Sequence, residues 1–505
     1  MEAFVENEDK EKASKVIITV SVIIIFALVI GVIIFIVAYT NEQLKYKRLN
    51  ETKNEVINQV NDDNSFRIEN VTNEKIINNS NETFDRSFGK VDIVWVDKAN
   101  NIIQYPLKPA LKNMTPVKFN QSTLSFVKTT ENDKDWYDYS KRMWANAIDD
   151  NLSYFVWIPR YAYKITYYSD SNFTKAIGYS DSRGILKINS DGTLTRIQSR
   201  ASGLKEIGNH YILAPAFMKD TASGFNNGGW DVNISGIWCS KYEMSLEVNS
   251  SHIDTESQAI GDVITSNIVR AVSRPAVSSW RNISIGKAYY NSYNYNRDLE
   301  SHMMKNSEWG AVSYLAYSIY GRNTYKITNN TSHDYLTGGT KVETDVYNTY
   351  SSESTTGNAT GVYDLSGNAW EFVSTFINNG YARLQEYGGT EEGYLLQNAS
   401  SNKYKTVYSK SSTDKGKGNY DNTHAIANYN ANMTRRGDAM YETSLSGYGS
   451  TAWNVNSSFY IQLDIPFLIR GGDFASQTSA GLFSYNGTSG QANASDSFRV
   501  MLVGD

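Results

Sequence analysis

The chain has 505 residues, among them 36 tyrosines, seven prolines and one cysteine, and a single cysteine excludes an intramolecular disulfide and a zinc site built on cysteines. Hydrophobic residues make up 40% of the chain and charged residues 20%, which fits a globular protein and excludes a collagen-like or wholly disordered one. The net charge of −5 at pH 7 gives the chain no general attraction for nucleic acid.

The first predicted element is an apolar run from Val16 to Tyr39, which contains no charged residue. As a helix that rises about 1.5 Å per residue it would be about 36 Å long, enough to cross a hydrocarbon core of about 30 Å. A cleaved signal peptide has a shorter apolar region, and a core helix is rarely apolar on every face for so long. We therefore expect one uncleaved transmembrane helix at residues 16–39.

The charges that flank this run are nearly balanced. Three lysines precede it, and three lysines and an arginine follow within residues 45–53, so the positive-inside rule does not fix its orientation. Large domains that follow a membrane helix cross the membrane largely regardless of these charges. We expect a cytoplasmic tail at residues 1–15, and the C-terminal domain outside the cell.

The segment after the predicted membrane helix has less apolar character. Residues 40–87 are rich in Asn, Asp, Glu and Ser toward their end, which is typical of a stalk and weakly structured linker. In the next segment, residues 88–135, Val91–Val96 and Ile102–Pro106 are typical of two strands that pair across a turn. We expect a small β-element there, or an N-terminal extension of the main domain.

Residues 136–505 are predicted to form the main domain. The sequence is aromatic and β-branched, with Gly, Asn or Ser every few residues, and its strand candidates include Tyr154–Ile158 and Ser497–Leu502. Helix candidates are few, the best being Trp136–Ile148 and Glu300–Tyr320. Long stretches have no clear period, so we expect an α+β fold with much irregular loop whose loops carry function.

Three motifs in this domain resemble one family. Gly361–Phe372 contain G-V-Y-D-L-S-G-N-A-W-E-F, which resembles the G-L-Y-D-M-x-G-N-V-W-E-W signature of the formylglycine-generating enzyme family, the sulfatase-modifying factors. Arg470–Phe474 with Ser497–Leu502 resemble the family's closing R-G-G-S-W and G-F-R pattern, and Gly236–Ser245 resemble its opening strand. The resemblance covers about residues 214–505 and implies a variant C-type lectin fold.

The domain is extended back to residue 136 by a second resemblance. Residues 144–165 are similar to a sequence segment found in uncharacterised surface and phage-related proteins of low-GC Gram-positive bacteria. In those proteins the segment precedes the same lectin-like domain. We therefore expect a bacterial surface protein with a C-type-lectin-like domain at residues 136–505.

The family resemblance implies a calcium site in the Gly361–Phe372 motif. Its ligands would be the side chains of Asp364 and Glu371 and the backbone carbonyls of Gly367 and Ala369. A tight loop with acidic residues at both ends can supply the six to eight oxygen ligands that calcium takes. The alternative is that Glu371 bonds the loop backbone and Trp370 fills the core without an ion.

Catalysis is where the chain departs from the family. The enzymes hold copper with two cysteine thiolates shortly after the R-G-G turn, and the matching positions here are Ser476 and Gly481. Cys239 lies in the opening strand, where a buried, inert thiol is expected. The five histidines have no H-x-H or H-x-x-x-H spacing, and no G-x-S-x-G, P-loop or H-E-x-x-H motif is present. We expect no enzyme activity and no copper, iron or zinc cofactor.

A binding role remains. Residues 473–495 are rich in Ser, Gly, Asn and aromatic residues, a composition typical of adaptable binding loops. The candidate ligand contacts are Phe474, Phe483, Tyr485 and Asn486, with the alternative that both Phe residues are buried. We therefore expect a membrane-anchored adhesin or receptor that binds an extracellular glycan or protein. The alternatives are a structural subunit of a surface filament or phage-derived particle, and an oxidase-type modifying enzyme.

Overall fold

The structure is a computed structural model, and it describes residues 75–76, 84–199, 204–219, 229–248, 251–252, 269–339, 348, 351–389, 395, 402–414 and 422–504. The chain divides into a unit of residues 1–72 and a unit of residues 73–505. The predicted tail at residues 1–15, the predicted membrane helix at 16–39 and nearly all of the linker at 40–87 lie outside the described residues. Within the described ranges, no helix is both long enough and apolar enough to span a membrane.

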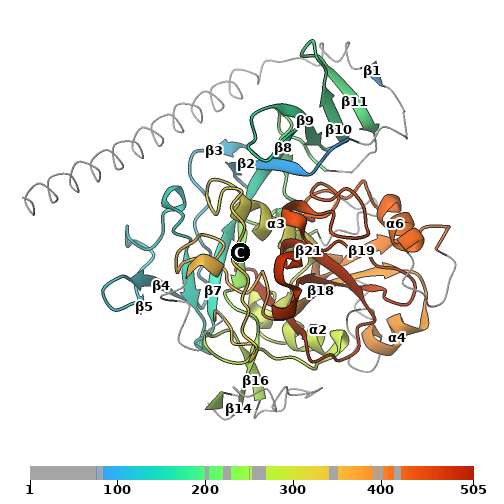
Figure 1. Ribbon diagram of the computed structural model, residues 1–505. Coiled ribbons are helices and arrows are strands. Elements are labelled where there is room, and N and C mark those ends of the chain that lie inside the picture. The colour runs from blue at the N-terminus through green and yellow to red at the C-terminus, as the bar shows by residue number, and fades with distance from the viewer. Residues whose placement is uncertain are drawn as a thin grey trace, which may run out of the picture. The chain divides into compact units, whose positions relative to one another are not determined.

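Two sheets contain most of the strands in residues 73–303 (Figure 1). The first has the order β1 (Lys75–Ile76), β11 (Leu194–Ser199), β10 (Gly184–Ile188), β9 (Ala176–Asp181), β8 (Tyr161–Tyr168), β2 (Phe88–Val96) and β3 (Ile102–Ile103), with β12 (Ile212–Leu213) paired to β8. The second has the order β17 (His302–Met303), β23 (Val500–Leu502), β13 (Gly236–Ser240), β7 (Tyr154–Pro159), β6 (Asn146–Ile148), β4 (Thr115–Asn120) and β5 (Ser125–Lys128).

Two further sheets complete the strands. The third is short, with the order β15 (Ser251–His252), β14 (Ser245–Val248) and β16 (Val269–Val272). The fourth has the order β19 (Thr406–Ser409), β18 (Trp370–Asn378), β20 (Phe467–Gly471) and β21 (Gly481–Thr488), with β22 (Asp496–Phe498) also paired to β18. The fourth sheet therefore joins the signature motif, the R-G-G turn and the closing segment.

The helices are short, and the irregular loops between them are long. The α-helices are α2 (Ile285–Tyr293), α3 (Asn306–Tyr317), α4 (Ala382–Gly388) and α6 (Asn422–Ala431). Single 3-10 turns are η2 (Tyr139–Lys141), η3 (Pro215–Phe217), η5 (Arg297–Leu299), η6 (Ser351–Glu353), η7 (Asn402–Tyr404), η8 (Trp453–Val455) and η9 (Phe474–Ser479). The described chain is thus of mixed α and β type with several sheets, as the sequence predicted.

The segment at residues 88–103 forms the two predicted strands. β2 and β3 pair antiparallel, with Trp95 opposite Ile103. β2 also pairs along its length with β8, from Phe88 opposite Tyr168 to Trp95 opposite Tyr161. Because β8 belongs to the predicted main domain, this segment extends that domain's first sheet.

The helix predicted at Trp136–Ile148 is wrong. Asp138 caps a single 3-10 turn, and Arg142 then takes a left-handed conformation with φ of 61°, which ends it. The following residues form β6, which pairs with both β4 and β7. Pairing with two neighbouring strands favours a strand over the predicted helix here, because it satisfies the backbone on both edges of β6.

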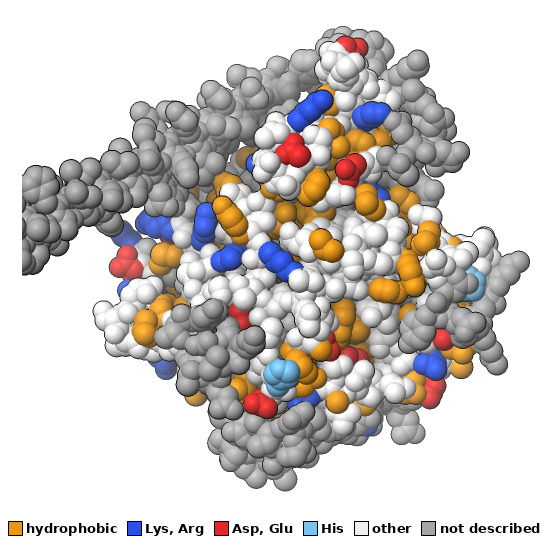
Figure 2. Space-filling model, viewed as in Figure 1, with side chains coloured by type: hydrophobic (Ala, Val, Ile, Leu, Met, Phe, Trp, Pro, Cys, Tyr) orange, Lys and Arg blue, Asp and Glu red, His pale blue; other side chains and the backbone are white. Residues whose placement is uncertain are grey.

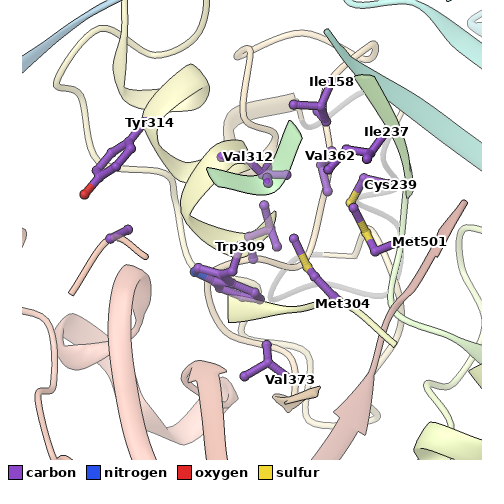
Figure 3. Packing of buried hydrophobic residues seen from close by; sticks show 14 of the residues in the cluster. Ile158, Ile237, Cys239, Met304, Trp309, Val312, Tyr314, Val362, Val373 and Met501 are labelled. Atoms are coloured by element: carbon purple, nitrogen blue, oxygen red, sulfur yellow. The ribbon is translucent and has the colours of Figure 1, made fainter. Parts of the chain in front are cut away.

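The second predicted helix is present but shorter, and it lies at the centre of the core. α3 contacts β2, β7 and β18, one strand from each of three sheets (Figure 1). Every one of its residues is buried, and Trp309 packs among apolar side chains that include Met304, Val312 and Val373 (Figure 3). The residues before α3 form β17 instead of a helical turn, since His302 pairs with Met501 of β23. The aromatic residues of this helix are therefore core.

Candidate functional site

The signature loop leads into β18 through a run of left-handed residues. Asp364, Gly367 and Asn368 have φ values of 61°, 82° and 64°. A Cβ on Gly367 would lie 2.3 Å from the carbonyl oxygen of Asn330, so the close approach of these two segments requires glycine here. Asn330 holds the loop on both sides, because its N–H donates to Ser366 O and its carbonyl accepts from the N–H of Asn368, both at 2.8 Å.

Glu371, at the start of β18, forms a fully buried ion pair with Arg499. The guanidinium donates to both carboxylate oxygens, from Nη2 at 2.7 Å and from Nε at 2.9 Å. Both side chains have no exposed surface. Arg499 also donates to Ser240 O at 2.8 Å and to Tyr363 O at 2.9 Å, so it ties the opening strand and the signature loop to the closing segment. Burial opposes the charged guanidinium, but the Glu371 carboxylate raises the pKa of Arg499 above its usual value.

Glu243 is a third buried acid at this loop. Its carboxylate accepts from the N–H of Ala369 at 3.1 Å and from Nδ2 of Asn368 at 2.9 Å. Burial, and then the charges of Glu371 and Asp364, raise the pKa of Glu243 well above its usual value. Glu243, and not Glu371, therefore bonds the loop backbone. Glu243 lies within the opening-strand motif at Gly236–Ser245, but no local pattern there distinguishes it as a partner of the signature loop.

Two buried oxygens of the loop have no hydrogen-bond partner. Asp364 Oδ1 accepts from Asn330 Nδ2 at 3.0 Å and from the N–H of Gly338 at 2.8 Å, but Asp364 Oδ2 and Asn368 Oδ1 are both unpartnered. Burial raises the pKa of Asp364, although Arg499 opposes this rise. Buried acceptors without donors cost free energy, and oxygen atoms of this kind are what calcium binds.

The predicted calcium ligands are therefore only partly arranged for an ion. Asp364 directs an unpartnered oxygen into the buried loop, whereas both oxygens of Glu371 accept from Arg499. Glu371 would have to share its oxygens between Arg499 and the ion. Calcium at Asp364, Gly367, Ala369 and Glu371 stays a prediction, and the structure adds Asn368 Oδ1 as a further candidate ligand.

Replacing Asp364 with Asn tests this site. Asn keeps the Oδ1 acceptor for Asn330 and Gly338 but replaces the unpartnered oxygen Oδ2 with an NH2 group, which cannot bind a cation. We expect calcium to raise the Tm of the parent chain relative to a chelator, by a gain of about 2.7 kcal/mol at one hundred times Kd, and to leave the Tm of Asp364→Asn unchanged. Thermal unfolding in calcium and in EGTA measures this. A parent Tm that is equal in both solutions would remove the calcium site.

The positions that match the copper ligands have structural contacts. Ser476 Oγ donates to Asp473 Oδ1 within η9. Gly481 begins β21 with φ of 150°, and a Cβ there would lie 2.4 Å from Asn456 Oδ1. A larger side chain at this position would therefore displace Asn456.

Cys239 lies inside the second sheet. It is fully buried and pairs with Met501 across β13 and β23, with Ile237 nearby (Figure 3). Burial raises the pKa of the Cys239 thiol to about 12, so the thiolate that metals and electrophiles require is not formed at neutral pH. This agrees with the inert, buried thiol expected from the sequence.

The predicted ligand-contact residues separate into two groups. Phe483 is fully buried against Tyr317 and Trp453, with ring centroids 5.0 and 5.2 Å away. Tyr485 is also fully buried, and its hydroxyl lies 2.9 Å from Ser444 Oγ. The structure therefore removes Phe483 and Tyr485 from the ligand contacts, because residues 444–460 cover the face of β21 on which they lie.

Phe474 and Asn486 are half-buried and remain candidates. Phe474 contacts His333 and Tyr335 edge to face, with ring centroids 4.7 and 5.0 Å away. Its backbone N–H donates to Asn368 O at 2.9 Å, which attaches this aromatic group directly to the signature loop. No local pattern connects His333 with Phe474, since 140 residues lie between them.

A scan against protein-family models and a search of curated proteins both give no match for this chain. The likeness to formylglycine-generating enzymes thus depends on the motifs quoted above.

Proposed function

We propose that the chain is a membrane-anchored extracellular binding protein, an adhesin or receptor. In this proposal residues 16–39 anchor the chain in the cell membrane, and residues 136–505 form a C-type-lectin-like domain of the formylglycine-generating enzyme type outside it. The domain binds a glycan or protein ligand and is catalytically silent. Support comes from the motifs, which Glu371, Arg499 and Glu243 connect within one buried network.

The aromatic group at Phe474 carries this proposal. Phe474 is half-buried, His333 is exposed, and both lie above a loop whose every described residue from Gly361 to Ala369 is buried. Amphipathic rings on a rigid base, next to small polar residues such as Ser476 and Gln477, are typical of surfaces that bind glycans and proteins. On the face shown in Figure 2, hydrophobic side chains lie in separate patches among polar surface.

The chemistry around the signature loop favours binding over oxidation. Ser476 and Gly481 offer no thiolate for copper, and the single thiol, Cys239, is buried in the second sheet. A ligating side chain at position 481 would also have to displace the side chain of Asn456.

Replacing Phe474 with Ala is expected to weaken ligand binding strongly. Intact cells that produce the full-length chain are applied to glycan and protein arrays, which tests outward exposure and binding together. Truncation of a central aromatic contact costs at least about 1.4 kcal/mol, so Phe474→Ala should weaken binding at least tenfold. Tyr105, which is 69% exposed, provides the control: Tyr105→Ala should bind like the parent.

Two outcomes would contradict the proposal. If cells with the chain bind no array component more strongly than cells without it, the chain is not a receptor for these ligands. If Phe474→Ala and Tyr105→Ala bind equally well, the contact surface does not include the Phe474 group.

A further inference from the structure

Three side chains that can bind a metal converge at the end of β9 in the first sheet. Asp181 ends β9, while Glu206 and His210 lie in the segment between β11 and β12. One ligand atom from each lies within 4.8 Å of the others. Asp181 and Glu206 are 25 residues apart in the sequence, so no short-range motif indicates that these side chains form a metal site.

His210 directs an unsatisfied nitrogen toward Glu206. Its Nδ1 atom is buried and has no hydrogen-bond partner. The nearest carboxylate oxygen, Glu206 Oε1, is 3.8 Å away, which is too long for a hydrogen bond. The imidazole plane is fixed by stacking on Tyr179, with centroids 5.2 Å apart and planes 16° from parallel. A buried nitrogen in a fixed ring without a partner costs free energy that a metal ion would offset.

The spacing between these atoms suits a small metal ion. In a tetrahedral zinc site with bonds of about 2.0–2.1 Å, neighbouring ligand atoms are about 3.3 Å apart. The 3.8 Å between His210 Nδ1 and Glu206 Oε1 closes to that value with a small rotation of the exposed end of Glu206.

Both carboxylates are oriented by other groups. Ser182 Oγ donates to Glu206 Oε2 at 2.9 Å, which leaves Oε1 facing His210. Arg196 donates to Asp181 Oδ1 at 2.8 Å and to Oδ2 at 2.6 Å, and the N–H of Arg183 donates to Oδ1 at 2.8 Å. An ionised carboxylate has about four acceptor positions, so Oδ2 keeps one for a metal. Outer contacts of this kind orient metal ligands in known sites.

The group is also open to solvent on one side. The side chains of Glu206 and His210 are 29% and 27% exposed, whereas that of Asp181 is 2% exposed. An ion can therefore enter from the surface and keep a water ligand, with Asp181 as the buried end of the site.

We propose that Asp181, Glu206 and His210 bind a divalent transition-metal ion of the zinc class. One imidazole nitrogen and two carboxylate oxygens bind the ion, and solvent occupies the remaining position. The ion joins the segment at residues 204–213 to the end of β9. This departs from the expectation that no zinc is bound, which relied on cysteines and on short histidine spacings.

Zinc binding by the purified full-length chain in detergent tests the site. After removal of metals with EDTA, equilibrium dialysis should find one tightly bound zinc ion per chain and a raised Tm. His210→Ala should lose this ion, and Glu206→Gln, which keeps the size of the side chain, should weaken binding at least about tenfold. Excess calcium should not displace the zinc, because the imidazole nitrogen favours a transition metal.

His424 provides a matched control, since its Nδ1 lies 3.9 Å from a single carboxylate oxygen, Asp414 Oδ1. His424→Ala should bind zinc like the parent. If the parent binds no zinc, or if Glu206→Gln binds it as tightly as the parent, the proposal is overturned. Because Glu206→Gln leaves Tyr179, Asp181 and Arg196 intact, it decides the question even if His210→Ala does not fold.

Discussion

Replacing Arg499 with Met is expected to lower the free energy of unfolding by about 3–5 kcal/mol or more, because it leaves the Glu371 carboxylate buried without its cation. Glu371 and Arg499 have no exposed surface, so water cannot replace the lost partner. The carbonyls of Ser240 and Tyr363 lose a donor as well. Urea unfolding followed by circular dichroism measures the change, and protease resistance reports whether a marginal variant still folds.

A second variant separates the ion pair from simple packing. In Glu371→Leu with Arg499→Met, both charges are gone and apolar side chains fill the space. Buried ion pairs replaced in this way often lose little stability, so the double variant should be more stable than Arg499→Met alone. An Arg499→Met variant within about 1 kcal/mol of the parent would show that the pair is not the tie between these segments.

Asp496 is expected to make the protein less stable above neutral pH than at pH 4. It begins β22, where burial and then a nearby Asp473 charge raise its pKa from 3.8 to about 7, against a hydrogen bond from Ser495 Oγ. A carboxyl with a raised pKa favours the folded state fully below pH 3.8, and this contribution is lost as the pH rises through about 7. This rise in the pKa of Asp496 corresponds to a change of about 4 kcal/mol at most in the free energy of unfolding between low and high pH.

Asp496→Asn removes this dependence, because the amide keeps an acceptor for Ser495 and never ionises. At pH 8 the variant should be more stable than the parent by roughly 2–4 kcal/mol, and near pH 4 the two should agree. Urea unfolding at both pH values provides the comparison. Equal stabilities at pH 8 would mean that the carboxyl remains solvated or paired when ionised.

Strands and motif residues that are determined by neighbouring residues in the sequence were predicted correctly. The strand at Val91–Val96 has β-branched and aromatic residues that suit a paired strand, and it forms β2. Glu371 and Arg499 belong to two of the motifs that resemble the family, and the two side chains form an ion pair in the structure. The segment at Trp136–Ile148 shows the limit, since a helix was predicted there and its last residues instead form β6, which pairs with β4 and β7.

Contacts between distant segments could not be predicted in the same way. The alternation along β21 places Phe483 and Tyr485 on one face, but only the fold shows that residues 444–460 cover that face. Glu243 was passed over because its partners, Asn368 and Ala369, lie more than a hundred residues later. Asp181 and His210 likewise become candidate metal ligands only because the fold places β9 next to the segment before β12.

The antiparallel pairing of β13 with β23 also means that the second sheet can be completed only late in synthesis of the chain. Ser240 and Arg499 are separated by 259 positions, a distance that a ribosome working at about 5–20 residues per second covers in roughly 13–50 s. Through that interval one edge of β13 has no neighbour, and from the synthesis of residue 371 onward Glu371 has no cation, so the nascent domain is open to aggregation. A chain that terminates before residue 499 never acquires either partner. The second sheet can therefore be completed only in a chain that has been translated through β23, because β23 pairs with both β13 and β17.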